Sequence, residues 1–232
     1  PIDFRMGDVS IRIEATAEHG MATIWDADIL IWAASQIVDA RDKGLSPSRL
    51  MAATPYEILT FIGRDDSARS YARLKAAFDR LQSTTVATSI RQPSERRRHR
   101  FSWINEWKER LDDAGRPLGI EMILPDWFYA GVLHDHLILT IDREYFALTG
   151  GLERWLYRLA PEHLHLKSGS LSPLKHFAYD LRAIVRRQPL PGYQLALVTD
   201  PDGRVRLTFQ PDPSGPFATA VARRPRRRTA GL

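Results

Sequence analysis

Hydrophobic residues recur with a helical period of 3.6 in three segments of the first half of the chain. Residues 27–40 place their apolar side chains on one face and are followed by Gly44, which predicts a first helix. Thr54-Pro55-Tyr56-Glu57 combines a capping box with proline at the first helical position and predicts the start of a second helix. Residues 67–82 predict a third helix, whose apolar stripe consists of Tyr71, Leu74, Phe78 and Leu81.

After the third helix the apolar residues recur at every second position, which is the spacing of a half-buried β-strand. Residues 86–90, 101–107 and 120–124 follow this pattern and predict a three-stranded antiparallel ribbon. Residues 10–13 alternate in the same way and predict a short strand before the first helix. Three helices followed by a ribbon indicate a winged-helix domain, which we assign to residues 1–125.

The second half of the chain repeats this plan of helices followed by strands. Short helices are expected over residues 126–132 and near 152–159, and a strand is expected over 137–141. A longer helix is expected over residues 172–187, because a serine that can cap it and a proline suited to its first turn precede the apolar stripe.

A hairpin is expected after this longer helix. Residues 193–198 and 204–209 alternate on either side of Asp200-Pro201-Asp202-Gly203, which is a favourable turn sequence. The chain is therefore predicted to be an α+β protein with two tandem winged-helix domains, the second over residues 126–210. Residues 211–232 are rich in proline, small residues and arginine, and we expect them to form a flexible basic tail.

The composition narrows the possible partners of these domains. The 232 residues carry a formal net charge of +5 and have a sequence pI of about 9.7, which favours polyanions such as nucleic acid. The chain has no cysteine, which excludes disulfides and thiolate metal sites and fits a reducing compartment such as the cytoplasm. No apolar run approaches the roughly 20 residues of a membrane span, so no membrane partner is expected.

The helix predicted over residues 172–187 carries a candidate DNA-binding surface. Lys175, Tyr179, Arg182 and Arg186 stand at offsets of 0, 4, 7 and 11 residues, which form one continuous strip on an α-helix. Such a strip offers cations for phosphates, an aromatic ring for sugar or base contact, and an arginine for bidentate contact with guanine. An ordinary solvated helix face is the alternative interpretation of the strip by itself.

The first domain shows two similar features. Arg69, Arg73, Ala76 and Arg80 have the same offsets on the third helix, although Asp79 interrupts its polar face. Basic rows on equivalent helices of two repeats favour DNA contact over a plain surface. The loop Arg96-Arg97-Arg98-His99-Arg100 is predicted to be the tip of the wing, which would reach the DNA backbone or minor groove, with a disordered basic loop as the alternative.

Small polar residues at the start of the helix predicted over residues 172–187, which we interpret as the recognition helix of the second domain, complete the predicted interface. Hydroxyl and backbone N–H groups at a helix entrance can bind phosphate. The predicted DNA-binding residues are Arg69, Arg73, Arg80, Arg96, Arg97, Arg98, Arg100, Lys167, Ser168, Ser170, Ser172, Lys175, His176, Tyr179, Arg182, Arg186 and Arg187.

Catalysis is not expected. The chain contains neither a phosphate-binding loop of the form G-x-x-x-x-G-K-[ST] nor an H-E-x-x-H sequence, and we predict no catalytic residue, metal site or cofactor. His163-Leu164-His165 has the form of a metal motif of strand-nicking replication enzymes, in which Tyr157 or Tyr179 could serve as nucleophile. That motif requires a buried central strand, whereas here it follows Pro161 in a short segment that we expect to be helical. For this reason strand nicking is kept only as an alternative function and not as the main prediction.

Three long segments of the sequence resemble the plasmid replication initiator protein A family of bacteria. They are GMATIWDADILIWAASQIVDA (Gly20 to Ala40), YARLKAAFDRLQSTTVATSIR (Tyr71 to Arg91) and KSGSLSPLKHF (Lys167 to Phe177). The resemblance runs from about Pro1 to Phe209 and omits only the tail. It implies two winged-helix domains that bind repeated duplex DNA sequences at an origin, help to open it, and bring in the host helicase or initiator. It also implies dimers that form through the first domain and repress their own gene.

The residues leave two further DNA-binding roles open. A plasmid transcriptional repressor without a replication role would use the same surfaces, and a single-stranded DNA-binding protein would use the same charges. The sequence specifies neither the DNA target nor the oligomeric state of the bound protein.

Overall fold

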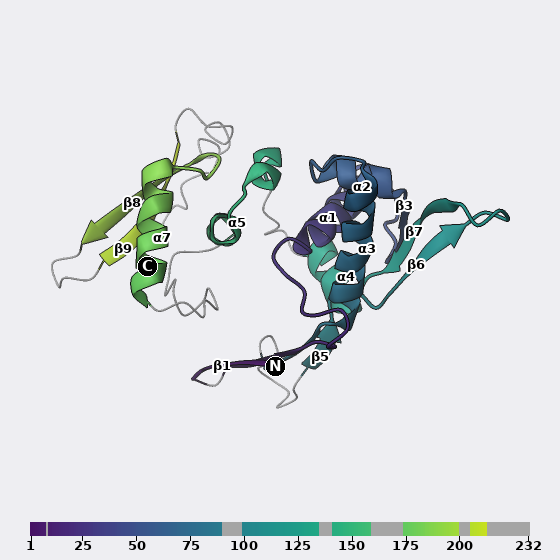
Figure 1. Cartoon of the computed structure of the whole chain (residues 1–232), viewed down its shortest axis with the longest axis horizontal. Coiled ribbons are helices and arrows are strands. Elements are labelled where there is room, and N and C mark those ends of the chain that lie inside the picture. The colour runs from purple at the N-terminus through teal and green to yellow at the C-terminus, as the bar shows by residue number, and fades with distance from the viewer. Residues whose placement is uncertain (8, 90–98, 135–140, 159–173, 200–204, 213–232) are drawn as a thin grey trace, which may run out of the picture. The chain divides into compact units, whose positions relative to one another are not determined.

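A computed structural model describes residues 1–7, 9–89, 99–134, 141–158, 174–199 and 205–212. Its contacts divide the chain into a first unit, Pro1–Thr140, and a second unit, Ile141–Leu232 (Figure 1). Each unit combines helices with antiparallel strands, so the predicted α+β class with tandem winged-helix units is confirmed.

Three helices form the centre of the first unit, as the hydrophobic period predicts. They are α1 (Ala27–Asp42), α2 (Pro55–Phe61) and α3 (Ala68–Ser83), which pack together in Figure 1. The predicted capping box opens α2, where the Thr54 hydroxyl accepts from Glu57 N at 3.2 Å and Thr54 N donates to Glu57 Oε2 at 2.7 Å. The apolar faces of the three helices meet in a core that includes Ile29, Ile37, Ile58, Phe78 and Leu81.

A three-stranded sheet completes the winged helix of the first unit. Its strands β3 (Leu50–Ala53), β7 (Pro117–Ile123) and β6 (Glu106–Leu111) lie in the spatial order β3-β7-β6 and are all antiparallel. The chain order of helix, strand, two helices and hairpin makes the β6–β7 hairpin the wing. Asp112 closes this hairpin, because its carboxylate accepts from Ala114 N at 2.9 Å and from Arg116 N at 2.8 Å.

A separate four-stranded sheet joins two strands that precede α1 to two strands that stand between α3 and the wing. It consists of β1 (Ile2–Met6), β2 (Val9–Glu14), β4 (Thr85–Thr88) and β5 (His99–Ser102), in the order β1-β2-β4-β5. The predicted three-stranded ribbon is therefore wrong, since β4 and β5 pair with each other but belong to a different sheet from β7. Strand alternation shows which residues share a face, but it does not show which strand lies alongside.

The chain changes direction between β5 and β6, within a segment predicted to be one strand. Trp103 N donates to Leu81 O at 3.2 Å, and the neighbouring Ile104 is fully buried. These contacts hold the chain against α3 and start a new strand at Glu106. The pair of strands β4 and β5 is consequently not the wing, so the prediction that Arg100 lies at the wing tip is wrong, and Arg96, Arg97 and Arg98 lie outside the described residues.

Helix α4 (Asp126–His134) packs against α1 and belongs to the first unit. The Tyr129 hydroxyl donates to Pro47 O at 2.6 Å, and the Trp127 ring lies 4.5 Å from that of Phe101. Because of these contacts the first unit extends to Thr140, whereas the sequence placed the start of the second domain at residue 126.

The described part of the second unit contains three helices and a hairpin. The 3₁₀ helix η1 (Arg143–Ala147) precedes α5 (Gly151–Tyr157), and α7 (Leu174–Arg187) precedes the antiparallel strands β8 (Tyr193–Thr199) and β9 (Val205–Pro211). The predicted strand over 137–141 and the His163-Leu164-His165 segment lie outside the described residues, apart from Ile141, which is in no strand. The core of this unit includes Tyr145, Leu156, Phe177, Ile184, Leu195 and Leu207.

A fully buried arginine holds η1 against α5. Arg154 Nε donates to Leu148 O at 3.0 Å and Nη2 donates to Phe146 O at 2.8 Å. Its guanidinium also lies over the Tyr145 ring, 4.9 Å from the centroid. Hydrogen bonds to backbone carbonyls and a cation–π contact offset the cost of removing this charge from water.

Candidate nucleic-acid interface

Helix α7 is divided lengthwise into a buried face and a basic face. Phe177, Leu181 and Ile184 are buried, as their helical spacing predicts. Lys175, Tyr179, Arg182 and Arg186, which we call the α7 row, are all exposed. At 1.5 Å per residue the α7 row is about 16 Å long.

The cations of the α7 row form no ion pair with any described residue. Within the ranges that the structure describes, no carboxylate lies at ion-pair distance from Lys175, Arg182 or Arg186. Tyr179 lies between them and is 66% exposed, which is unusual for so large an apolar ring. His176 and Asp180 are also exposed and lie on the neighbouring side of the helix, where Asp180 is the only acidic residue of α7.

Gln188 fixes the angle between α7 and the hairpin that follows it. Its amide nitrogen donates to Val185 O at 2.6 Å and to Leu195 O at 2.7 Å, while its amide oxygen accepts from Leu195 N at 2.7 Å. The side chain thereby pairs with β8 as a neighbouring strand would. Gln188 has a φ of 49°, which is uncommon for a residue other than glycine and turns the chain out of the helix.

Arg187 has a structural role, although it is part of the predicted interface. Its Nη2 donates to Glu153 Oε1 at 2.7 Å, and the Glu153 side chain is only 4% exposed. Glu153 also accepts from Gly150 N at 3.1 Å, so the ion pair joins the end of α7 to the start of α5. Gln188 and Arg187 together hold α7 in place and leave its basic row facing solvent.

Helix α3 carries a shorter basic surface in the first unit. Arg69 and Arg73 are exposed, and in the described part of the chain neither has an ion-pair partner. Ala72 and Ala76 lie beside them and leave little side chain between the helix backbone and an approaching ligand. This surface can contact phosphates, and the wing of the same unit lies next to it.

The wing is fixed to α3 by polar and aromatic contacts. Lys75 Nζ lies 2.8 Å from the Glu109 carboxylate, and Trp107 Nε1 donates to Asp79 Oδ1 at 3.2 Å. The Trp107 ring also stacks on Phe78, with their centroids 5.3 Å apart. The position of β6 relative to α3 is therefore set by side chains from two successive turns of the helix.

The loop before α3 shapes the first turn of this helix. Ser67 caps the helix by accepting from Ser70 N at 3.3 Å, and the Ser70 hydroxyl donates to Asp65 Oδ1 at 2.8 Å. Hydrogen bonds from the Ser67 and Ser70 hydroxyls and from Ser67 N lower the pKa of the Asp65 carboxyl from 3.8 to about 2. A permanently ionised carboxylate next to the first turn is favourable for the helix dipole.

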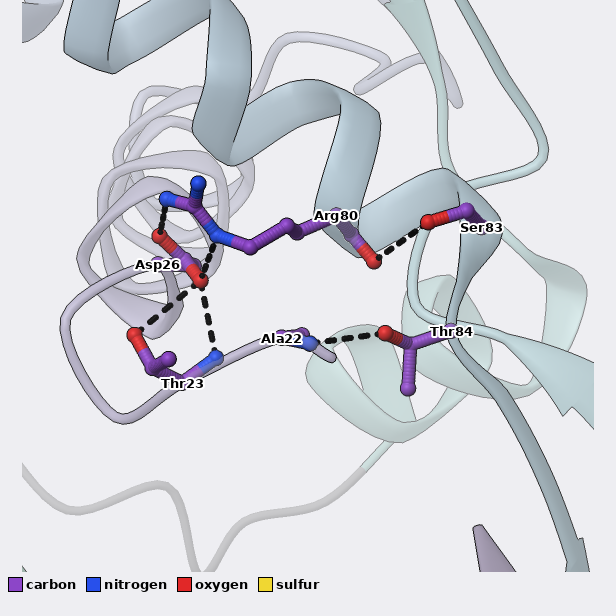
Figure 2. Close-up of polar contacts among 6 residues, drawn as sticks. All are labelled: Ala22, Thr23, Asp26, Arg80, Ser83 and Thr84. Atoms are coloured by element: carbon purple, nitrogen blue, oxygen red, sulfur yellow. Dashed lines mark hydrogen bonds and ion pairs between the residues drawn. The ribbon is translucent and has the colours of Figure 1, made fainter. Parts of the chain in front are cut away.

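Arg80, the last residue of the predicted row on α3, points into the protein. Figure 2 shows its guanidinium against Asp26, with Nε 2.9 Å from Oδ2 and Nη2 2.6 Å from Oδ1. Asp26 is 2% exposed and also accepts from the backbone N–H and the hydroxyl of Thr23. This partner raises the pKa of Arg80 through hydrogen bonding. Arg80 therefore links α3 to the start of α1, and only Arg69 and Arg73 of its row are free to meet a ligand.

Of the remaining predicted DNA-binding residues, one lies on β5 and the others lie outside the residues that the structure describes. Arg100 lies on β5, where its Nη1 is 3.2 Å from Glu14 Oε2 on β2. The predicted positions outside the described residues are Arg96, Arg97, Arg98, Lys167, Ser168, Ser170 and Ser172.

Sequence reasoning missed the residues that support the interface. Gln188, Glu153 and Asp26 are separated in the sequence from the side chains they position, and no local pattern marks them. The sequence did contain a signal for Arg80 and Arg187, because both lie at the edges of the two apolar stripes, where long side chains can turn inward.

A groove of about 490 Å³ lies between the start of α1, the end of α2 and the side of α3. Ile62, Leu74 and Ala77 contribute apolar surface, and the Arg64 guanidinium lies over the Trp25 ring, 5.8 Å from its centroid. Among the described residues no group of three metal-ligating side chains comes together. In the same ranges, no helix has the length and hydrophobicity to span a membrane.

The comparisons with known proteins place the chain in a family. The model of the family Replication initiator protein A matches residues 1–195. The chain belongs to this family. It is also 34% identical over 209 residues to the "Putative replication protein" of Wigglesworthia glossinidia brevipalpis, a match that covers 83% of the chain and 75% of that protein.

Solved structures with the same fold are domains 2 and 3 of RctB, in two crystal structures. One has a TM-score of 0.65 and 15% sequence identity, with 90% of each chain covered. The other has a TM-score of 0.57 and 15% identity, with 89% of this chain and 88% of that chain covered. At this identity the likeness shows the fold alone, which extends over both units of this family member.

Proposed function

We propose that this protein starts DNA replication by binding repeated duplex sequences at a plasmid origin, with α7 in the major groove. Membership of the replication initiator family supports the process, and the α7 row supports the surface. The observation that carries the proposal is a contrast within α7. Arg187 is held by Glu153, whereas the exposed Lys175, Arg182 and Arg186 have no ion-pair partner in the described part of the chain.

The order of residues in the α7 row suits a division of work on DNA. Lys175 and Arg186 stand at the two ends of the row, where phosphates border the groove. Tyr179 and Arg182 stand at its centre, where an arginine can contact guanine O6 and N7 with two hydrogen bonds. His176 is close enough to the centre to contact a base or a sugar on the neighbouring side.

The first unit would add contacts that do not depend on sequence. Arg69 and Arg73 on α3 face solvent and can bind phosphates. A second binding domain on the same chain raises affinity through effective concentration, without any new contact in the first. The predicted contacts of Arg96, Arg97 and Arg98 would contribute in the same electrostatic way.

The proposal includes partners and regulation that follow from an initiator role. The protein would self-associate, recruit the host replicative helicase or initiator, and repress its own gene by occupying overlapping sites. It would act in the cytoplasm, on the plasmid, and without catalysing a reaction. A transcriptional repressor without replication activity would share the DNA surface, and origin-dependent plasmid maintenance in cells distinguishes the two.

Footprinting on the origin of the parent plasmid tests the proposal. We expect regularly spaced protected repeats, and we expect Arg182→Ala to lower affinity for a repeat by about 1–3 kcal/mol and relax the preference at one base pair. Arg143→Ala is the matched control, because Arg143 is an exposed arginine of the same unit that lies on η1.

Two results would contradict the proposal. Equal affinity for origin and random DNA would remove sequence recognition, and equal losses for Arg182→Ala and Arg143→Ala would remove α7 from the interface. Cleavage of supercoiled origin DNA in the presence of Mg²⁺, abolished by His163→Ala, would establish the strand-nicking alternative instead.

A further inference from the structure

The exposed face of α3 lies between two different surfaces of the first unit. On one side, Lys75 and Asp79 contact the β6–β7 hairpin, which is the wing. On the other side, Arg73 and Ala77 line the groove next to α1 and α2. Residues two positions apart on a helix point about 200° apart, so Arg73 and Lys75 face in nearly opposite directions. Figure 1 accordingly shows α1 and the wing on opposite sides of α3.

DNA bound along α3 would meet both of these surfaces. A major groove is about 12 Å wide and an α-helix with its side chains is about 10–12 Å across, so a helix in the groove has one sugar-phosphate backbone on each side. The charges on each side of α3 therefore determine which side can bind a phosphate backbone.

The cations of the wing are engaged within the wing itself. Residues 106–121 contain three basic and five acidic side chains. Each of the three basic side chains lies between 2.7 and 3.3 Å from a carboxylate of the same hairpin. The pairs are Lys108 with Glu121, Arg110 with Glu121, and Arg116 with Asp112. A phosphate that approached the wing would have to displace one of these carboxylates.

The remaining side chains of the wing are acidic or apolar. Glu106 and Asp113 are exposed, and in the part of the chain that the structure describes neither has a cationic partner. Leu111 and Leu118 are each 53% exposed. Carboxylates repel phosphates, and a leucine side chain offers them no hydrogen-bond donor. The wing is therefore poorly suited to lie against a DNA backbone.

The opposite side of α3 carries exposed cations. Arg64, Arg69 and Arg73 are exposed, and within the described ranges no carboxylate lies at ion-pair distance from any of them. Residues 64–73 contain three basic and two acidic side chains, so basic residues predominate here, whereas acidic residues predominate in the wing. This side of α3 is the one that can bind a phosphate backbone.

The Trp25 ring holds Arg64 on this side of α3. The Arg64 guanidinium lies over the ring, 5.8 Å from its centroid, and both side chains line the groove together with Arg73. A guanidinium that binds a ring through its face keeps its N–H groups, which lie in its plane, available for a phosphate. Trp25 stands between Thr23 and Asp26, which are joined by two hydrogen bonds (Figure 2). The turn that carries the ring is therefore fixed.

We propose that the first unit binds DNA with the α1 and α2 side of α3 against a phosphate backbone and with the wing turned away from the DNA. Arg64 is the phosphate contact that this orientation adds to Arg69 and Arg73, and Trp25 positions it. The orientation is the opposite of the one expected from the sequence, in which the wing reaches the DNA. The inference rests on the proposed function for the presence of DNA and specifies how the first unit lies on it.

Tethered cleavage of DNA tests this orientation, and the lack of cysteine in the chain allows a single reactive position. Asp66→Cys, close to Arg64, and Asp113→Cys, at the wing tip, each replace an exposed carboxylate in a loop, so the two full-length variants are matched. Each variant is coupled to an iron–EDTA reagent and bound to a fragment of the plasmid origin. We expect strand cleavage from residue 66 and little or none from residue 113. Cleavage from residue 113 that equals or exceeds that from residue 66 overturns the proposal, as does the lack of cleavage from residue 66.

Salt titrations of binding measure the contact of Arg64 separately. Arg64→Ala should reduce the slope of log K against log salt by about 1, because one phosphate contact is lost, and Arg64→Lys should restore most of it. Asp113→Lys adds a cation to the wing tip and should change neither the slope nor the affinity, whereas a wing that lies on DNA would gain about 1 in slope. An unchanged slope for a folded Arg64→Ala variant, or a steeper slope for Asp113→Lys, overturns the proposal. Urea unfolding shows whether Arg64→Ala is folded, and Asp113→Lys provides the test if it is not.

The same DNA distinguishes this inference from the proposed function. Arg182→Ala on α7 is measured alongside, and binding that it leaves unchanged contradicts the proposed role of α7. Equal affinity for origin and random DNA contradicts sequence recognition in the same way. In both cases the cleavage from residues 66 and 113 still decides how the first unit lies on the duplex.

Discussion

Arg80 and Asp26 join the end of α3 to the start of α1 through two hydrogen bonds of 2.9 and 2.6 Å. They are separated by 54 residues in the sequence, and Thr23 donates two further hydrogen bonds to the same carboxylate. The side chain of Arg80 is 26% exposed and that of Asp26 is 2% exposed, so the pair is largely removed from water. The pair is part of the packed structure of the first unit, so the Arg80 guanidinium is not free to contact DNA.

Arg80→Ala should therefore destabilise the protein rather than weaken its contact with DNA. The variant leaves the buried Asp26 carboxylate without its cation, which costs about 2–4 kcal/mol. Urea unfolding followed by tryptophan fluorescence measures this loss. Arg73→Ala on the same helix is the control, and we expect its stability to change by less than about 0.5 kcal/mol while its DNA affinity falls. Equal stability of the two variants would contradict this role of Arg80.

Arg186→Ala and Arg187→Ala should separate binding from stability within α7. Arg186 has no acidic partner in the described residues, so its removal should lower DNA affinity and reduce the slope of log K against log salt by about 1. Arg187→Ala should instead lower stability by about 1–3 kcal/mol, since it leaves Glu153 buried and unpaired. Salt titrations of binding and urea unfolding of both variants check this. A lowered salt slope for Arg187→Ala alone would show that the assignments are reversed.

Gln188→Glu should loosen the hairpin of the second unit. The substitution replaces a donor that bonds two carbonyl oxygens, Val185 O and Leu195 O, with an oxygen that faces both. We expect a loss of about 2–4 kcal/mol in unfolding free energy at neutral pH. Hydrogen exchange should show faster opening of β8. Gln194→Glu makes the same chemical change on an exposed position of β8 and should have little effect.

Stability should fall at low pH as Asp65 is protonated. Hydrogen bonds from the hydroxyls of Ser67 and Ser70 lower the pKa of the Asp65 carboxyl to about 2 in the folded protein, whereas the pKa of an unperturbed aspartate side chain is 3.8. A lowered folded pKa stabilises the protein above pH 3.8, and this contribution is lost as the pH falls towards 2. An NMR titration of the Asp65 carboxyl measures the pKa directly. Ser70→Ala should raise it towards 3.8, and an unchanged midpoint would show that Ser70 does not hold this carboxylate.

Local patterns predicted the helices well, because the signals that start and end a helix are adjacent in the sequence. The capping box of Thr54 and Glu57 forms as expected, and α3 begins one residue after the predicted start at Ser67. The exposed row on α7 follows from helical spacing in the same way. These features depend on contacts over three or four residues, which a sequence displays directly.

Strand partners and long-range ion pairs could not be predicted in this way. The alternation of β4, β5 and β7 is equally regular, yet only β4 and β5 pair with each other. Their sheet is completed by β2, part of which was predicted as a strand, and by β1, for which the sequence showed no pattern. Helical offsets placed Arg80 on a basic face and Arg187 was predicted to bind DNA, but an arginine side chain is long enough to turn towards a carboxylate from another element. The choice between solvent and such a partner depends on tertiary contacts.

The chain leaves α3 to form β4 and β5 and then returns to the same place, where Trp103 N meets Leu81 O and Gln82 Nε2 meets Asn105 O at 3.4 Å. The segment between these contacts contains β4 and β5 and is anchored to α3 at both ends. Residues can be gained or lost within this segment while α3 and the wing keep their relative position. Relatives of this protein should therefore differ most in length there, without any change in how β6 packs against α3.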